Sequence, residues 1–301
     1  MENPELKNHK LQTGERPEKE GLEGRKHTQK KKDLISINRL KNYFTGIFTG
    51  IRGLIGVPIT GIAFAELLIY SGKIKEAIFL HAIILIALSL SATVMKDEQV
   101  QKSYQALLLL PILRLVNLSM PTFFDMALYS FVFIYAPLAI PVAIAAMNQK
   151  MNRKELGLTF DKKLWLYISL AIPLSFLLGY GEYSTIRTGY LIPDLSLLNL
   201  LKLTVVMVFF VGFIEEILFR AMLQTRLSEA FGTLKGILLA SFLFGIMHSG
   251  YGTPYEILYT SFVGFIIGII FYKTQSLPFV TILHGLVNVF LFGVIPHMGL
   301  S

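Results

Sequence analysis

Residues 212–223, GFIEEILFRAML, place three charged side chains inside a long apolar run. Glu215, Glu216 and Arg220 stand where a lipid bilayer would penalise each charge by roughly a few kcal/mol. Ionisable groups at membrane depth therefore face a partner or a water-filled cavity, and they mark a site by default. The stretch predicts a membrane-spanning helix with a polar face directed into the protein.

The composition of the whole chain agrees with a membrane protein. Of the 301 residues, 53% are hydrophobic and 16% are charged, and the mean hydropathy of +0.57 is too high for an ordinary soluble domain. The lack of cysteine excludes a cysteine protease and any zinc site built on cysteine. The net charge of +8 does not indicate nucleic-acid binding, because no folded soluble stretch carries a basic stripe with interleaved aromatic residues.

Three parts of the chain differ in composition and in their motifs. Residues 1–40 carry few apolar side chains and predict a disordered, charged cytoplasmic tail. This polar segment is too long for the start of a signal peptide, so the first apolar helix should stay in the mature protein. Residues 41–190 predict N-terminal transmembrane helices. Residues 191–301 predict a helical core that contains the polar motifs.

Apolar windows of about 20 residues, the length that crosses a bilayer, recur from residue 54 onward. They predict an all-α fold, a polytopic transmembrane helical bundle with about nine spans. Eight spans are the alternative, because the third window is short and contains Pro111 and Arg114. The nine windows are 54–71, 77–95, 104–120, 127–147, 164–181, 200–221, 236–250, 256–272 and 277–296.

Basic residues in short loops predict the orientation of the chain. They precede the first window and follow the fourth and the sixth, which puts all of them on one side if the N-terminus is cytoplasmic. With an odd number of spans, the C-terminus then lies outside. We therefore expect a multi-pass protein of the cell membrane, in contact with lipid. The basic residues are Lys30, Lys31, Lys32, Arg39, Lys41, Lys150, Arg153, Lys154, Lys162, Lys163, Arg226 and Lys235.

Residue spacing separates the three charges of the opening stretch. Glu216 and Arg220 are four residues apart, so they share one face of a helix and can pair. Glu215 is rotated by about 100° from Glu216 and can point elsewhere. The spacing predicts an ion pair that locks helices together and a separate carboxylate.

The same spacing recurs in two later windows. Phe244 and His248 are four residues apart in FGIMH, and His284 and Asn288 are four apart in HGLVN. Each helix would present its polar groups in one narrow stripe. Together with Glu215, these stripes predict one polar cluster shared by three helices.

The residue types in this cluster suit hydrolysis. A carboxylate in a low-dielectric site can act as the general base for water, and histidine can exchange protons with the developing tetrahedral species. An asparagine amide can donate to an oxyanion. Glu215, His248 and His284 would equally satisfy a catalytic zinc with one position open for water. The residues alone leave the metal-free and the zinc-dependent site open.

EEILFR, FGIMH and HGLVN, in this order and in separate hydrophobic windows, resemble the three motifs of the CPBP (Abi) intramembrane proteases. That family includes type II CAAX prenyl endopeptidases and bacteriocin-processing enzymes. The resemblance covers about residues 198–296. It implies an all-helical, multi-pass enzyme that hydrolyses peptide bonds of membrane-associated substrates, such as prenylated CAAX-type proteins or leader peptides.

The resemblance also implies roles for the motif residues. Glu215 would activate the water together with His248. His284 and Asn288 would stabilise the oxyanion. We favour this glutamate mechanism without a cofactor and keep zinc as the alternative. The residues expected to support these groups without acting on the substrate are Glu216, Arg220 and Phe244.

Two other classes of protein could use the same residues. A non-catalytic membrane scaffold or a bacteriocin-immunity protein would keep the polar cluster for folding alone, and a transporter could use it as a proton relay. The lack of an inverted repeat disfavours a transporter. Glu66, His81 and Arg114 are scattered, and we interpret them as interfacial or locally paired. We favour an enzyme whose partners are lipid and a peptide substrate, without nucleic acid.

Overall fold

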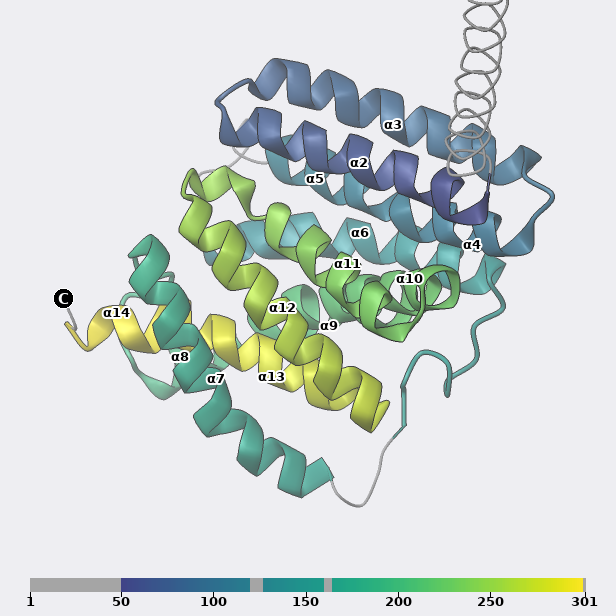
Figure 1. Cartoon of the computed structure of the whole chain (residues 1–301). Coiled ribbons are helices and arrows are strands. Elements are labelled where there is room, and N and C mark those ends of the chain that lie inside the picture. Colours follow the sequence, from purple (N-terminus) through teal and green to yellow (C-terminus); the bar gives the residue numbers. More distant parts are fainter. Residues whose placement is uncertain (1–49, 120–126, 160–163, 300–301) are drawn as a thin grey trace, which may run out of the picture. The chain divides into compact units, whose positions relative to one another are not determined.

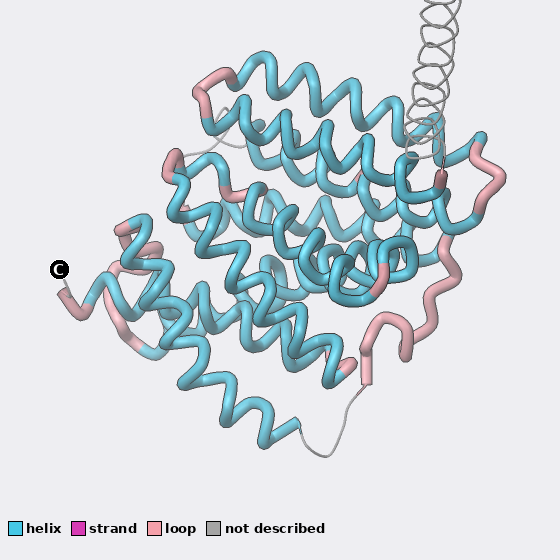
Figure 2. The backbone as a smooth tube through the Cα atoms, viewed as in Figure 1, coloured by secondary structure: helices cyan, strands magenta, loops and turns pink. Residues whose placement is uncertain are grey.

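The computed structural model describes residues 50–119, 127–159 and 164–299. In these ranges the regular structure is helical throughout, and no strand occurs among them (Figure 2). The prediction of an all-α, polytopic bundle is confirmed. The tail expected to be disordered, at residues 1–40, lies outside the described residues.

Thirteen α-helical segments are labelled α2 to α14 along the described chain (Figure 1). Three π-helical segments, η2, η3 and η5, continue some of them, and η4 is a short 3-10 turn. The bounds are α2 Ile51–Tyr70, α3 Ile74–Val94, α4 Glu98–Leu107, α5 Leu109–Ser119, α6 Leu128–Asn148, α7 Leu164–Ile186, α8 Leu197–Val205, η2 Val206–Gly212, α9 Phe213–Glu216, η3 Ile217–Gln224, α10 Thr225–Phe231, α11 Thr233–Ile246, η4 Ser249–Tyr251, α12 Pro254–Thr274, α13 Leu277–Val289, η5 Phe290–Val294 and α14 Ile295–His297.

Eight of the described helical stretches are long and apolar enough to cross a membrane, which indicates a multi-pass membrane protein. Each of them overlaps one of the nine predicted windows. The remaining window, 104–120, falls on α4 and α5, which are separate short helices. The position of each terminus relative to the membrane stays a prediction from the basic residues.

Pro111 explains the break between α4 and α5. A proline nitrogen has no hydrogen to donate to the carbonyl four residues earlier, here that of Leu107, where α4 ends. Both short helices pack against α3, and they follow one another across the bundle (Figure 1). Eight, the alternative count, is thus the number of described helical stretches that qualify, and α4 and α5 together occupy the third predicted window.

Glu215 and Glu216 lie in a continuous helical stretch of 35 residues, Leu197–Phe231. Their short segment, α9, has the π-helical segments η2 and η3 on either side. A π-helical turn holds an extra residue, because each N–H bonds to the carbonyl five residues earlier, and such turns occur frequently at functional sites. The backbone is therefore irregular on both sides of the acidic pair.

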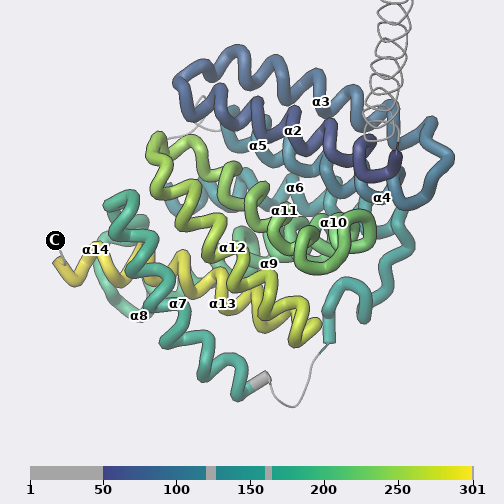
Figure 3. The backbone as a smooth tube through the Cα atoms, in the orientation of Figure 1, coloured from purple at the N-terminus to yellow at the C-terminus, as the bar shows by residue number. Residues whose placement is uncertain are grey.

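Two glycines let α13 approach this stretch closely (Figure 3). A Cβ atom on Gly285 would lie 2.5 Å from Cγ2 of Val208, and one on Gly212 would lie 3.0 Å from the carbonyl oxygen of Thr281. Small residues serve such close packing in membranes, where helices gain little from burying apolar surface. The contact brings His284, next to Gly285, beside the acidic pair.

Residues 51–301 form one compact unit. Within it, α7 and α12 pack on α13, and α6 packs on η2. The division into residues 41–190 and 191–301 stays a prediction that rests on the motifs.

Candidate active site

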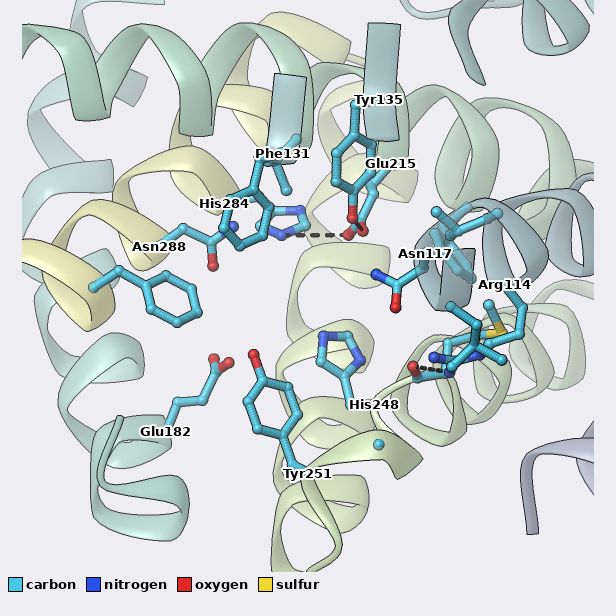
Figure 4. Close-up of a pocket in the computed structure, with 17 residues that line it drawn as sticks. Arg114, Asn117, Phe131, Tyr135, Glu182, Glu215, His248, Tyr251, His284 and Asn288 are labelled. Atoms are coloured by element: carbon cyan, nitrogen blue, oxygen red, sulfur yellow. Dashed lines mark hydrogen bonds and ion pairs between the residues drawn. The ribbon is translucent and has the colours of Figure 1, made fainter. Parts of the chain in front are cut away.

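A cavity of about 370 Å³ lies between the helices that carry the three motifs. Glu215 reaches it from α9, His248 from the turn after α11, and His284 and Asn288 from α13 (Figure 4). All four residues expected to carry the chemistry thus line one cavity. Their catalytic roles stay predictions.

Glu215 presents its carboxylate to the cavity and is 6% exposed. Its Oε1 atom accepts a hydrogen bond from the hydroxyl of Tyr135, on α6. Its Oε2 atom lies 3.6 Å from Nε2 of His284, which is too long for a direct hydrogen bond. One carboxylate oxygen is therefore held by the protein, while the other is left to a water molecule or a substrate.

Glu216 does not line the cavity, as its rotation from Glu215 predicted. Its Oε2 accepts a hydrogen bond from Nε of Arg220 at 3.0 Å, and both side chains are fully buried. Its Oε1 lies 2.7 Å from Nδ1 of His284. The ion pair expected from the spacing is present, and Glu216 also fixes the ring of His284.

His284 lies between the two carboxylates, and its contacts define where its hydrogen sits. An ionised carboxylate only accepts hydrogen bonds, so Nδ1 of His284 carries the hydrogen that is donated to Glu216. Nε2 points toward Glu215 and the cavity. Donation from Nε2 to a bound anion would require a second hydrogen on the ring.

Phe244 contacts both histidines without lining the cavity. Its backbone carbonyl accepts a hydrogen bond from Nδ1 of His248 at 2.9 Å, which leaves Nε2 of His248 for the cavity. Its ring meets the ring of His284 edge-on, with the centroids 5.6 Å apart. The guanidinium carbon of Arg220 lies 4.9 Å from the centroid of the same ring, in cation–π geometry.

Asn288 follows His284 by one helical turn and also lines the cavity. In the described part of the chain, its side-chain amide has no hydrogen-bond partner, and its side chain is 8% exposed. A buried amide that is not engaged elsewhere can donate to an oxyanion.

A second buried network, which we call the Glu66 cluster, consists of Glu66, His81, Arg114 and Ser249. Nε and Nη2 of Arg114 donate to the two oxygens of Glu66 at 2.8 and 2.6 Å, and Oγ of Ser249 donates at 2.7 Å. Nε2 of His81 lies 3.1 Å from Oε1 of Glu66. Glu66 and His81 are fully buried, so these residues are not interfacial, and the alternative, that they are locally paired, is confirmed by the ion pair between Glu66 and Arg114. They come from three helices whose polar faces meet inside the protein.

The Glu66 cluster holds the turn that carries His248. Arg114 also donates a hydrogen bond to the backbone carbonyl of Met247. Ser249, bound to Glu66, follows His248 in the chain. The residues on both sides of His248 are therefore tied to α2 and α5.

Four further polar residues that line the cavity were missed: Asn117, Tyr135, Glu182 and Tyr251. They lie outside the motifs, so no spacing rule connects them to the site. One signal was present for Glu182, which is the single charged residue between residues 164 and 186. An ionisable residue alone in a spanning helix marks a functional position by default.

Among the described residues, no group of three or more histidine, aspartate or glutamate residues is arranged to hold a metal ion. The 3.6 Å between Nε2 of His284 and Oε2 of Glu215 does not itself exclude zinc, because two ligands about 2.0 to 2.2 Å from one metal lie about 3.3 to 3.6 Å apart. The site without a metal stays the prediction that we favour, and we derive no step through a metal ion.

Comparison with known families supports the peptidase interpretation of the motifs. Residues 197–290, about a third of the chain, match the family model described as type II CAAX prenyl endopeptidase, Rce1-like. The matched segment contains all three motifs. No curated protein and no solved structure matches the chain. Over this segment the chain is similar to type II CAAX prenyl endopeptidases, which supports the CAAX protease family and an endopeptidase activity in general.

Proposed function

We propose that this protein is an intramembrane endopeptidase of the CPBP (Abi) type, which uses Glu215 to activate water. The observation that supports this most is the meeting of Glu215, His248 and His284 around one cavity, with a carboxylate oxygen and two imidazole Nε2 atoms left to a ligand. The substrate would be a membrane-associated peptide, either a prenylated CAAX-type tail or a leader peptide.

The first step is the attack of water on the scissile carbonyl carbon. Oε2 of Glu215 accepts a proton from the water as its oxygen bonds to that carbon. The Tyr135 hydroxyl holds the other oxygen and so fixes the plane of the carboxylate. Nε2 of His248, whose Nδ1 hydrogen is used by Phe244, can accept the second hydrogen of the water and orient it.

The second step is the collapse of the tetrahedral intermediate. Its oxyanion would accept hydrogen bonds from the Asn288 amide and from Nε2 of a doubly protonated His284. Glu216 and Arg220 keep the His284 ring in place from behind. Glu215 then returns its proton to the leaving nitrogen as the C–N bond breaks, which yields a new carboxylic acid and a new amine, and the acid transfers its proton to the amine.

Reconstituted protein tests the proposal. Liposomes would contain wild type, Glu215→Gln, His248→Ala or the control Glu76→Gln, whose side chain is exposed on α3. The substrates are two internally quenched peptides, a farnesylated CAAX-type peptide and an unprenylated leader-type peptide.

We expect wild type and the control to cleave at least one peptide. Both site variants should lose about 10²- to 10⁴-fold in rate, the usual contribution of general acid–base catalysis. Undiminished cleavage by Glu215→Gln or by His248→Ala contradicts the proposed roles. If wild type leaves both peptides and the native membrane proteome intact, the scaffold alternative is favoured instead.

A further inference from the structure

Glu182 is a buried carboxylate in the cavity wall that the proposed reaction does not use. It lies on α7 and is 6% exposed. Figure 4 shows its side chain directed into the cavity next to Tyr251. Its backbone carbonyl accepts a hydrogen bond from Thr185 at 2.8 Å. Within the described ranges, however, no hydrogen bond or ion pair reaches its carboxylate.

A buried carboxylate without a partner is costly, and proteins normally pair such charges. Two other buried acidic residues of this bundle follow that rule, since Glu66 is paired with Arg114 and Glu216 with Arg220. Glu182 has no such partner among the described residues. A buried carboxyl group without a cation beside a candidate active site can gain that cation with a ligand.

The surroundings of Glu182 hold a second buried acidic group. Glu256, in the first turn of α12, is fully buried and lies close to Glu182. Its Oε2 lies 2.5 Å from the hydroxyl oxygen of Thr185, while its Oε1 has no partner among the described residues. Among the residues that line the cavity, Arg114 is the single arginine or lysine, and Glu66 already neutralises it. This end of the cavity therefore favours a cation.

An aromatic ring and an opening lie at the same end. Tyr251 lines the cavity although it is 47% exposed, so the cavity reaches the protein surface there. Its ring stacks with that of His248, with the centroids 6.3 Å apart. Tyrosine faces attract cations. Glu182 lies four residues, about 6 Å along the axis, from the end of α7 at Ile186, within reach of a long side chain that enters from that surface.

We propose that Glu182, with Tyr251 beside it, forms a subsite for the ammonium or guanidinium group of a lysine or arginine side chain in the peptide substrate. The inference rests on the proposed endopeptidase function and adds a substrate preference, namely a basic residue close to the scissile bond. The cation supplies the partner that Glu182 lacks in the free protein. Substrates without a basic residue leave the carboxylate unpaired and bind more weakly.

A peptide series measures this preference in liposomes. Each position of the peptides used to test the proposed function is replaced in turn by lysine, by its uncharged analogue norleucine, or by glutamate. For wild type, we expect lysine at one position near the scissile bond to raise kcat/KM over norleucine by roughly ten- to hundredfold, the range of a charge-assisted hydrogen bond. Glu182→Gln should bring this ratio close to one, whereas the exposed control Glu76→Gln should keep it.

Equilibrium binding separates this inference from the proposed function. The same peptides, labelled with a fluorophore, are titrated against Glu215→Gln and against Glu215→Gln with Glu182→Gln. Tighter binding of the lysine peptide that depends on Glu182 supports the subsite even if no peptide is cleaved. Cleavage by wild type with equal kcat/KM for lysine and norleucine at every position overturns the subsite and leaves the endopeptidase standing.

The headgroup of phosphatidylethanolamine also carries an ammonium group, so this lipid competes with a peptide side chain for the Glu182 subsite. The titrations are therefore repeated in nanodiscs of phosphatidylcholine and of phosphatidylethanolamine. A Glu182-dependent effect of the phosphatidylethanolamine headgroup that is the same for all peptides overturns the assignment to a peptide side chain. An unchanged preference for lysine in both lipids supports it.

Discussion

The Glu66 cluster and the Glu215 site both bury charge within membrane-spanning helices, but they satisfy it differently. In the Glu66 cluster, both carboxylate oxygens receive donors from Arg114, Ser249 donates to Oε2 as well, and Nε2 of His81 lies 3.1 Å from Oε1. In the Glu215 site, Tyr135 engages one oxygen, and the other lies 3.6 Å from His284. The first network is closed, and the second is open toward a cavity.

The difference indicates how to distinguish structural from chemical charge inside a membrane protein. A closed network offsets the cost of burial with its own partners, so we expect a substitution in it to lower the free energy of unfolding. An open site leaves hydrogen-bonding capacity to a ligand, so we expect a substitution in it to lower the catalytic rate. Burial alone does not separate the two, since Glu66 is fully buried and Glu215 is only 6% exposed.

Breaking the closed network should give the largest effect. Glu66→Leu leaves Arg114 as an uncompensated buried charge, so we expect the free energy of unfolding to fall by about 3 to 5 kcal/mol. Glu66→Leu combined with Arg114→Leu should recover much of this loss, because the stranded charge is gone. Steric trapping or denaturant titration in bicelles measures both variants.

The control for this measurement is Glu76→Ala, at an exposed position, which should change stability by no more than about 0.5 kcal/mol. A change of less than about 1 kcal/mol for Glu66→Leu would show that Arg114 finds another partner. In that case the ion pair between Glu66 and Arg114 would contribute little to the stability of the fold.

Tyr135→Phe should have a smaller effect, and the effect should be on rate. The variant removes the hydrogen bond to Glu215 and loosens the carboxylate, so we expect kcat to fall by roughly tenfold with little change in KM. Tyr104→Phe is the matched control, because Tyr104 donates a hydrogen bond to the Leu54 carbonyl at 3.0 Å and does not line the cavity. A loss of kcat that is equal in both variants would assign the effect to general destabilisation.

Chelation should have the smallest effect of all. If the open oxygen of Glu215 serves a water molecule rather than a metal ion, treatment with 1,10-phenanthroline should change the cleavage rate by less than about twofold. Metal analysis of the treated, active protein should then find much less than about one zinc per chain. Activity that is lost on chelation and restored by zinc would reverse this conclusion.

Much of the site was predictable because helical spacing is a local rule. The pairing of Glu216 with Arg220 and the separate direction of Glu215 both followed from the angle between successive residues. The Glu66 cluster was not predictable in this way, since Glu66 and Arg114 are 48 residues apart and meet only through packing. Tyr135 was missed because α6 is almost uniformly apolar, so its sequence does not show which face turns inward. Glu182 was missed because the predicted window, 164–181, ended one residue before it, whereas α7 continues to Ile186.

Pro111 had already set the window at 104–120 apart in the sequence and led to the alternative count of eight spans, and the structure divides this region into α4 and α5. The π-helical turns around α9 were not predicted. The extra residue in a π-helical turn leaves no mark on apolar composition.

The cavity wall takes Arg114 from α5, Tyr135 from α6 and Glu182 from α7, all outside the segment 197–290 that matches the family. The matched segment therefore does not contain the whole site. Grafted onto another set of membrane helices, it would carry its three motifs. It would lose the Tyr135 hydroxyl that binds Glu215, the Arg114 contact that holds the His248 turn, and the carboxyl group of Glu182. Designs that aim to transfer or shorten this protein should take the helices from α2 onward as the smallest exchangeable part.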